Sequence, residues 1–178
     1  MVSPAYRAAL LAALLTLSGS GTRAEAPVPA SHGTLEVRVT DHREAIEDFA
    51  RLDLLVEAIE IHPVGEPRQR GWIELAPTAP GVDLTQVTRG RHAVIFAGSV
   101  PARSYDAIRL QARLGEFVHR EGRAVSIKAD LSPILLRFPV QTGLRTVATL
   151  DLVLLDLSDH PGKGYELHIK QARAEGPA

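Results

Sequence analysis

The sequence contains no cysteine, so it can form neither a disulfide nor a lipid-modified cysteine. A domain of this kind must be held together by its hydrophobic core alone. Aromatic residues are also scarce, with four Phe, three Tyr and one Trp among 178 residues. This number is small for a surface that binds carbohydrate by ring stacking.

Neither sign of charge dominates, since 20 Lys and Arg stand against 21 Asp and Glu. Nucleic-acid binding calls for a basic face, so a nucleic acid is not an expected partner. The most continuous apolar stretch near the N-terminus, residues 8–17, has roughly ten residues, whereas a membrane-spanning helix needs about 20. We therefore expect no transmembrane segment.

The N-terminus is typical of a secretory signal peptide, with Arg7, then the apolar stretch, then the small-x-small pattern at Ala24-Glu25-Ala26. We predict cleavage after Ala26 and a periplasmic or secreted location, without a lipobox. Residues 27–32 are predicted to be a flexible lead-in, 33–172 a single domain and 173–178 a tail. Without Arg7, Arg23 and Glu25 the mature chain has 18 basic and 20 acidic residues, a net charge of −2.

The segment from Leu52 to His62 predicts a long β-strand whose apolar phase changes part-way. Leu52, Leu54 and Val56 alternate on one face, and Ile59 and Ile61 then continue out of step. Because a strand has a period of two, a β-bulge near Glu57-Ala58 would bring both sets to one face. Leu52, Leu55, Val56 and Ile59 also lie at helical spacing, but Pro63 and Gly65 end the segment and the neighbouring segments alternate, which favours a strand.

Many other short segments alternate and end at Gly or Pro. Residues 34–40 predict a half-buried strand, 147–157 a central strand, and 117–118 with 125–127 a hairpin that turns at Glu121-Gly122. The pattern predicts an all-β fold, an antiparallel β-sandwich of roughly eight or nine short strands.

The order of these motifs resembles the bacterial family called domain of unknown function 4382. The resemblance extends from about residue 33 to 160 and depends on Gly33-Thr34-Leu35, Ile59-Glu60-Ile61-His62, Gly71-Trp72, Val82-Asp83-Leu84, Val100-Pro101-Ala102 before Tyr105, Ile108-Arg109-Leu110 and Leu150-Asp151-Leu152. It implies a secreted or envelope β-sandwich that is transthyretin-like or prealbumin-like. It implies no known reaction and no catalytic residues.

No catalytic motif is present: the sequence has no G-x-S-x-G elbow, no phosphate loop and no H-E-x-x-H pair. The seven histidines are the only chemically suggestive set, because imidazole binds copper and zinc. If the strand from Thr34 pairs antiparallel with the strand from Leu52, His32 and His62 lie at one end. His92 or His160 could then complete a three-ligand site. Alternatively, the topology separates the two strands, or the histidines are solvated loop residues.

Two aromatic residues have predicted structural roles. Trp72 is expected in the core or between the sheets, with sugar stacking as the alternative. Tyr105 follows a proline-containing corner, which is typical of a tyrosine corner whose hydroxyl group fixes a loop.

These observations favour a non-catalytic binding or envelope protein that has no cofactor. Its expected partner is a small ligand or an envelope protein. The alternative is a periplasmic copper- or zinc-binding protein that uses His32, His62, His92 and His160. A hydrolase of unrecognised type is a third hypothesis.

We predict that the exported protein begins at or close to Pro27, because the apolar stretch ends in a cleavage pattern. Mass spectrometry of the protein from the periplasm or medium checks this. A full-length chain retained in the cytosol would contradict the prediction.

Overall fold

The computed structural model describes residues 31–41, 45–161 and 164–176, so the predicted signal peptide, most of the lead-in and His42 lie outside these residues. The described chain is all-β with two short 3-10 helices. The elements are β1 (His32–Asp41), η1 (Ala45–Asp48), β2 (Phe49–Pro63), β3 (Ile73–Leu75), β4 (Gly81–Asp83), η2 (Leu84–Gln86), β5 (Ala93–Pro101), β6 (Ser104–His119), β7 (Ile127–Asp130), β8 (Ile134–Pro139), β9 (Arg145–Asp156) and β10 (Tyr165–Glu175).

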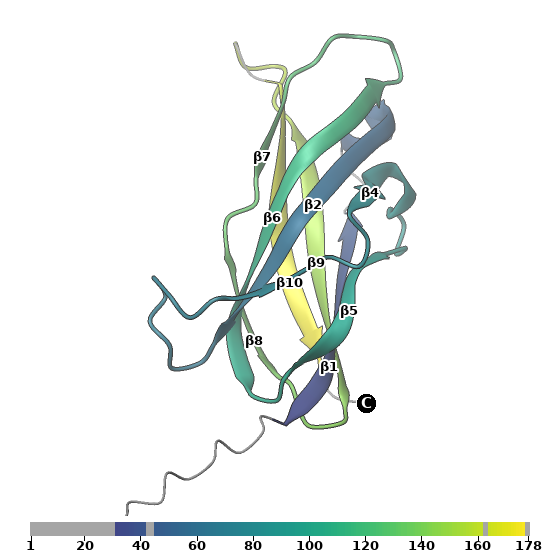
Figure 1. Ribbon diagram of the computed structural model, residues 1–178. Coiled ribbons are helices and arrows are strands. Elements are labelled where there is room, and N and C mark those ends of the chain that lie inside the picture. Colours follow the sequence, from purple (N-terminus) through teal and green to yellow (C-terminus); the bar gives the residue numbers. More distant parts are fainter. Residues whose placement is uncertain (1–30, 42–44, 162–163, 177–178) are drawn as a thin grey trace, which may run out of the picture.

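The ten strands form two facing sheets, with β2 and β6 crossing over β9 and β10 (Figure 1). Sheet A has the order β5-β1-β9-β10-β7, and sheet B has the order β3-β2-β6-β8 with β4 also on β2. Sheet A is mixed, because β1 pairs with β9 and β10 with β7 in parallel, and it is curled into a half-barrel. The expectation of a purely antiparallel sandwich was therefore wrong, since alternation shows which face of a strand is buried and not the direction of its neighbour.

The predicted bulge in β2 is confirmed. Val56 pairs with Ala112 of β6 while Ala58 pairs with the adjacent Gln111, so one extra residue of β2, Glu57, is accommodated between them. Before the bulge Leu52 and Leu54 are buried in the core, and after it Ile59 and Ile61 are buried in the same core. The bulge thus puts both apolar sets on the inner face of sheet B.

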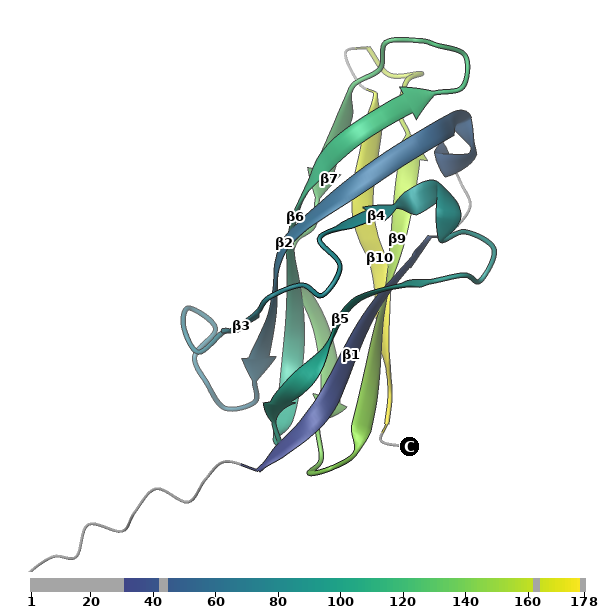
Figure 2. The ribbon, with the colours of Figure 1, turned by 45° about the vertical axis from the view of Figure 1, so that its right-hand side comes forward.

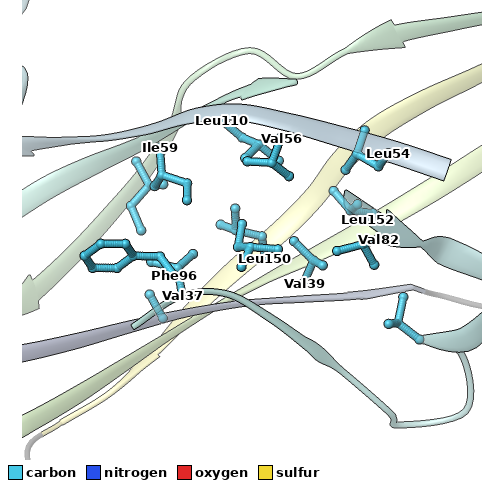
Figure 3. Packing of buried hydrophobic residues seen from close by; sticks show 14 of the residues in the cluster. Val37, Val39, Leu54, Val56, Ile59, Val82, Phe96, Leu110, Leu150 and Leu152 are labelled. Carbon is cyan, nitrogen blue, oxygen red and sulfur yellow. The ribbon is translucent and has the colours of Figure 1, made fainter. Parts of the chain in front are cut away.

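The core fills the space between the sheets, and residues of both sheets meet there (Figure 3). The predicted inward face of β1 is confirmed, since Leu35, Val37 and Val39 are fully buried. The prediction of a central strand at residues 147–157 is also confirmed, because β9 lies between β1 and β10. Its inner face contributes Ala148, Leu150, Leu152 and Leu154 to the core.

The predicted hairpin was wrong. The hairpin at residues 117–127 does not form, because β6 belongs to sheet B and β7 pairs with β10 in sheet A. The Gly122 turn is present, with φ of 66°, but the chain uses it to cross between sheets. β10 continues to Glu175, past the predicted domain boundary at residue 172, through backbone pairing with β9. No helix of the described chain is long and apolar enough to cross a membrane.

We predict that Leu154→Asp unfolds the domain, because Leu154 is only 1% exposed and an unpaired buried carboxylate costs several kcal/mol. That loss is comparable with a total stability of about 5–15 kcal/mol. Leu135→Asp is the matched control, since Leu135 is 71% exposed and should tolerate the same change. Thermal melts followed by circular dichroism check this, and equal melting of both variants would contradict the assignment of β9.

Candidate functional site

The four histidines proposed as metal ligands lie at two ends of the sandwich. His32 opens β1 and pairs with Pro101, whereas Val39, near the other end of β1, pairs with Ala93, directly after His92. His160 lies in the β9–β10 turn, beyond the same end as His92, because β9 runs parallel to β1. Within residues 31–41, 45–161 and 164–176 no three His, Cys, Asp or Glu side chains are grouped to hold a metal ion.

The pairing of β1 with β2 on which the histidine site was conditional does not occur, although His32 and His62 do lie at the same end. The chain passes from sheet A to sheet B after β1, so β1 pairs with β5 and β9, and β2 pairs with β6. The start of β1 and the end of β2 both contact the turn between β5 and β6. There the Ala102 N–H donates to the Ser31 carbonyl (2.7 Å), and the Val64 N–H donates to the Ser104 carbonyl (3.0 Å). The topology that separates the two strands, held open as an alternative, is the one observed.

His62 is fully buried and both ring nitrogens have partners within the protein. Nδ1 lies 2.8 Å from Asp106 Oδ1, and Nε2 lies 3.3 Å from the Pro67 carbonyl oxygen. Both ring nitrogens therefore already have an oxygen partner inside the protein, and the fully buried ring is a poor candidate for a metal ligand. Arg68 donates to the other oxygen of Asp106 (3.2 Å), which attaches the 64–72 loop to β6.

Trp72 lies outside the core cluster, so its predicted position in the core was wrong. It precedes β3 and follows Gly71, whose φ is 87°, so the alternation of Ile73 and Leu75 does not set its direction. Its Nε1–H donates to the Arg68 carbonyl (3.0 Å), and its ring lies 5.0 Å from the His62 ring. The Arg109 guanidinium lies 4.5 Å from the ring centre, so this face is already occupied and unsuited to stacking on a sugar.

Glu60 lies two residues before His62 on β2 and belongs to the same group of polar side chains. It accepts from Arg109 through both carboxylate oxygens, one contact being Nη2 to Oε1 at 2.7 Å, and from Gln111 at 2.6 Å. The Arg109 hydrogen bonds lower the pKa of the Glu60 carboxyl below its ordinary 4.5, against the effect of burial. We name Glu60, His62, Arg68, Trp72, Asp106 and Arg109 the outer-face cluster; its contacts are internal and fix the 64–72 loop on sheet B.

Tyr105 has the geometry predicted for a tyrosine corner. Its side chain is buried, its hydroxyl donates to the Pro101 carbonyl (2.8 Å), and its ring stacks on Phe138 at 5.3 Å. Burial raises the pKa of the Tyr105 hydroxyl. The contact fixes the turn between β5 and β6, and hence the crossover from sheet A to sheet B.

A hollow of about 340 Å³ lies at the opposite end of β1 and β2, where η1, η2 and the 88–91 turn meet. Figure 2 shows the two 3-10 helices, in blue and teal, next to each other. We name this hollow the arginine pocket; its lining residues are Ile46, Glu47, Thr85, Thr88, Arg89, Arg91 and Arg120.

The wall of the arginine pocket is anchored by a second buried histidine, His119. Its Nδ1 accepts from the Glu121 N–H (3.2 Å), and its Nε2 lies 3.3 Å from the Tyr165 hydroxyl, which donates to Asp48 of η1 (3.0 Å). Burial and the contact with Asp48 raise the pKa of Tyr165 to about 12. Since the Arg120 N–H donates to the Asp48 carbonyl (2.8 Å), these contacts fix η1 against the end of β6.

A family model described as domain of unknown function (DUF4382) matches residues 32–168, most of the chain. The chain belongs to this family. No curated protein and no solved structure matches the sequence. The DUF4382 resemblance expected from the order of motifs is thus confirmed.

In this DUF4382 domain, sequence reasoning missed the outer-face cluster and the arginine pocket. The cluster had a partial signal, because Glu60 and His62 alternate with buried isoleucines and Arg109 and Gln111 alternate with Ile108 and Leu110. Its formation depends on the β2–β6 register, which pairs Glu60 with Arg109. The pocket had no local signal, since Arg120 is distant in sequence from Arg89 and Arg91.

We predict that Glu60→Gln lowers the free energy of unfolding at pH 7 by about 1–3 kcal/mol, through loss of charged hydrogen bonds. The folded-state pKa of Glu60 is lowered, so the stabilisation is present above 4.5 and is lost as the pH falls through the folded-state value. The difference between wild type and variant in urea denaturation should therefore shrink from pH 7 to pH 3.

Glu57→Gln is the matched control, because Glu57 forms an exposed ion pair with Arg113. It should change stability little at either pH. A Glu60→Gln effect no larger than that of the control would refute the stabilising role of the outer-face cluster.

Proposed function

We propose that this protein is a non-catalytic binding module that works in the periplasm or outside the cell, with the arginine pocket as its ligand site. A small ligand, or a group exposed on an envelope protein, is the expected partner. The proposal includes the transthyretin-like, or prealbumin-like, architecture implied by the family resemblance. Two sheets around one core support that architecture, whereas the parallel pairs of sheet A depart from it.

One observation supports the proposal most directly: two arginine side chains of the pocket are held by backbone carbonyl groups of the protein itself. The Arg91 Nε–H donates to the Thr88 carbonyl (3.3 Å) and the Arg120 Nε–H donates to the Glu47 carbonyl (2.8 Å). A binding site whose side chains are already ordered avoids the entropy cost of ordering them on binding.

The location and size of the pocket also suit a binding site. Loops on a rigid β scaffold commonly carry binding residues, and small-molecule sites measure about 300–1,000 Å³. The pocket of about 340 Å³ falls at the lower end of this range. The alternative of a copper or zinc site built from His32, His62, His92 and His160 gains no support from their separation.

We predict that at least one class of small ligand raises the melting temperature of the purified protein, by about 5–10 °C near 100 times Kd. The panel comprises phosphate and sulfate, carboxylates, neutral sugars, amino acids, and Zn(II) and Cu(II). Mass analysis of each ligand after incubation should show it unchanged.

The outcomes of this screen separate the functional hypotheses. A shift with Zn(II) or Cu(II) alone would favour the metal-binding alternative, and a chemically converted ligand would favour an enzyme. A melting temperature unmoved by every class would refute a small-ligand module.

A further inference from the structure

We propose that the arginine pocket binds a phosphate or sulfate group, either as the free oxyanion or carried on a larger molecule. This inference rests on the proposed binding function and names the chemical class of its ligand.

The net charge of the pocket matches such a ligand. Arg89, Arg91 and Arg120 contribute three positive charges and Glu47 one negative charge, which leaves a net charge of +2. A phosphate monoester carries about −1.5 to −2 at neutral pH. Glu47 neutralises little locally, since its contact with Arg89 is 3.5 Å long and both side chains are more than half exposed.

The donor groups have the geometry that oxyanions require. Because Arg91 and Arg120 each use Nε to bind a backbone carbonyl, the planar guanidinium is held in one orientation. The Nη groups of both residues make no hydrogen bond within the part of the chain that the structure describes. Paired N–H groups of arginine match tetrahedral oxyanions in bidentate contacts, which are stronger and more specific than those of lysine.

The backbone of the 88–91 turn gives independent support. Arg89 has φ of 60° and is the only non-glycine residue with positive φ within residues 31–41, 45–161 and 164–176. Left-handed backbone is unfavourable for an arginine, and such residues cluster at ligand sites, where the surrounding structure holds them. The turn brings Arg89 and Arg91 to the same pocket, on either side of Gly90.

The test is isothermal titration of the purified exported protein with sodium phosphate and sodium sulfate at fixed low ionic strength. Arg91→Gln and Arg120→Gln each remove one oriented guanidinium, and Arg89→Asn removes a charge with a residue that tolerates left-handed backbone. Arg113→Gln is the matched control, because it removes the same charge from an exposed site on sheet B. Circular dichroism melts confirm that each variant remains folded.

We expect saturable binding to wild type that weakens as sodium chloride is added, because salt screens exposed charges. Arg91→Gln and Arg120→Gln should each weaken binding about tenfold or more. Arg89→Asn should also weaken it, and Arg113→Gln should leave it within about twofold, as expected for a distant charge. No saturable binding, or an equal loss in the Arg113 control, would overturn the inference.

Additional ligands in the same titration distinguish a lipid headgroup from a soluble oxyanion. They also distinguish failure of the oxyanion inference from failure of the proposed binding function. Glycerol 3-phosphate and vesicles of phosphatidylcholine with phosphatidic acid are tested beside free phosphate. Vesicle binding that phosphate displaces assigns a lipid headgroup, and binding of the soluble anions alone assigns a soluble ligand. If neutral ligands raise the melting temperature and oxyanions do not bind, the inference fails and the binding function stands; if no ligand binds, both fail.

Discussion

The extra residue at Glu57 determines which side chains the second half of β2 turns to the core and which it turns to the outer face of sheet B. Without it, the period of two would turn Ile59 and Ile61 outward and direct Glu60 and His62 into an apolar core. Burying an ionisable side chain there without partners costs several kcal/mol, so the bulge is a condition of the fold. With it, one strand contributes apolar residues to the core along its whole length and polar residues to the outer-face cluster.

The outer-face cluster and the arginine pocket show two different uses of arginine. In the cluster, Arg109 is committed to Glu60 and Trp72, so its charge is balanced within the protein. In the pocket, Arg91 and Arg120 are bound by neutral carbonyl groups, which orient the guanidinium and leave its charge uncompensated. The first arrangement stabilises a loop, and the second is suited to a partner of opposite charge.

Features that depend on local periodicity could be predicted from the sequence. Features that depend on which distant strands pair with one another could not. The buried face of β1, the bulge in β2 and the contact of Tyr105 with Pro101 all follow from residues close together in the chain. The parallel pairing of β1 with β9 and the crossing after Gly122 depend on which distant strand is adjacent, and alternation does not record this. Trp72 was misplaced because the strand that would set its direction begins one residue later.

The position of β1 constrains how the protein reaches its folded state. Its partners are β5 and β9, and Thr34 lies opposite Arg145, so one edge of β1 can pair with β5 early while its other edge is covered only when β9 is present. Closing the long loop between β1 and β9 is slow, whereas the β1–β5 and β2–β6 pairs are closer in the chain and can associate earlier. A chain that emerges gradually from its N-terminus therefore remains incompletely folded until β9 has appeared, and any fragment that ends before Arg145 lacks the strand that joins both halves of sheet A.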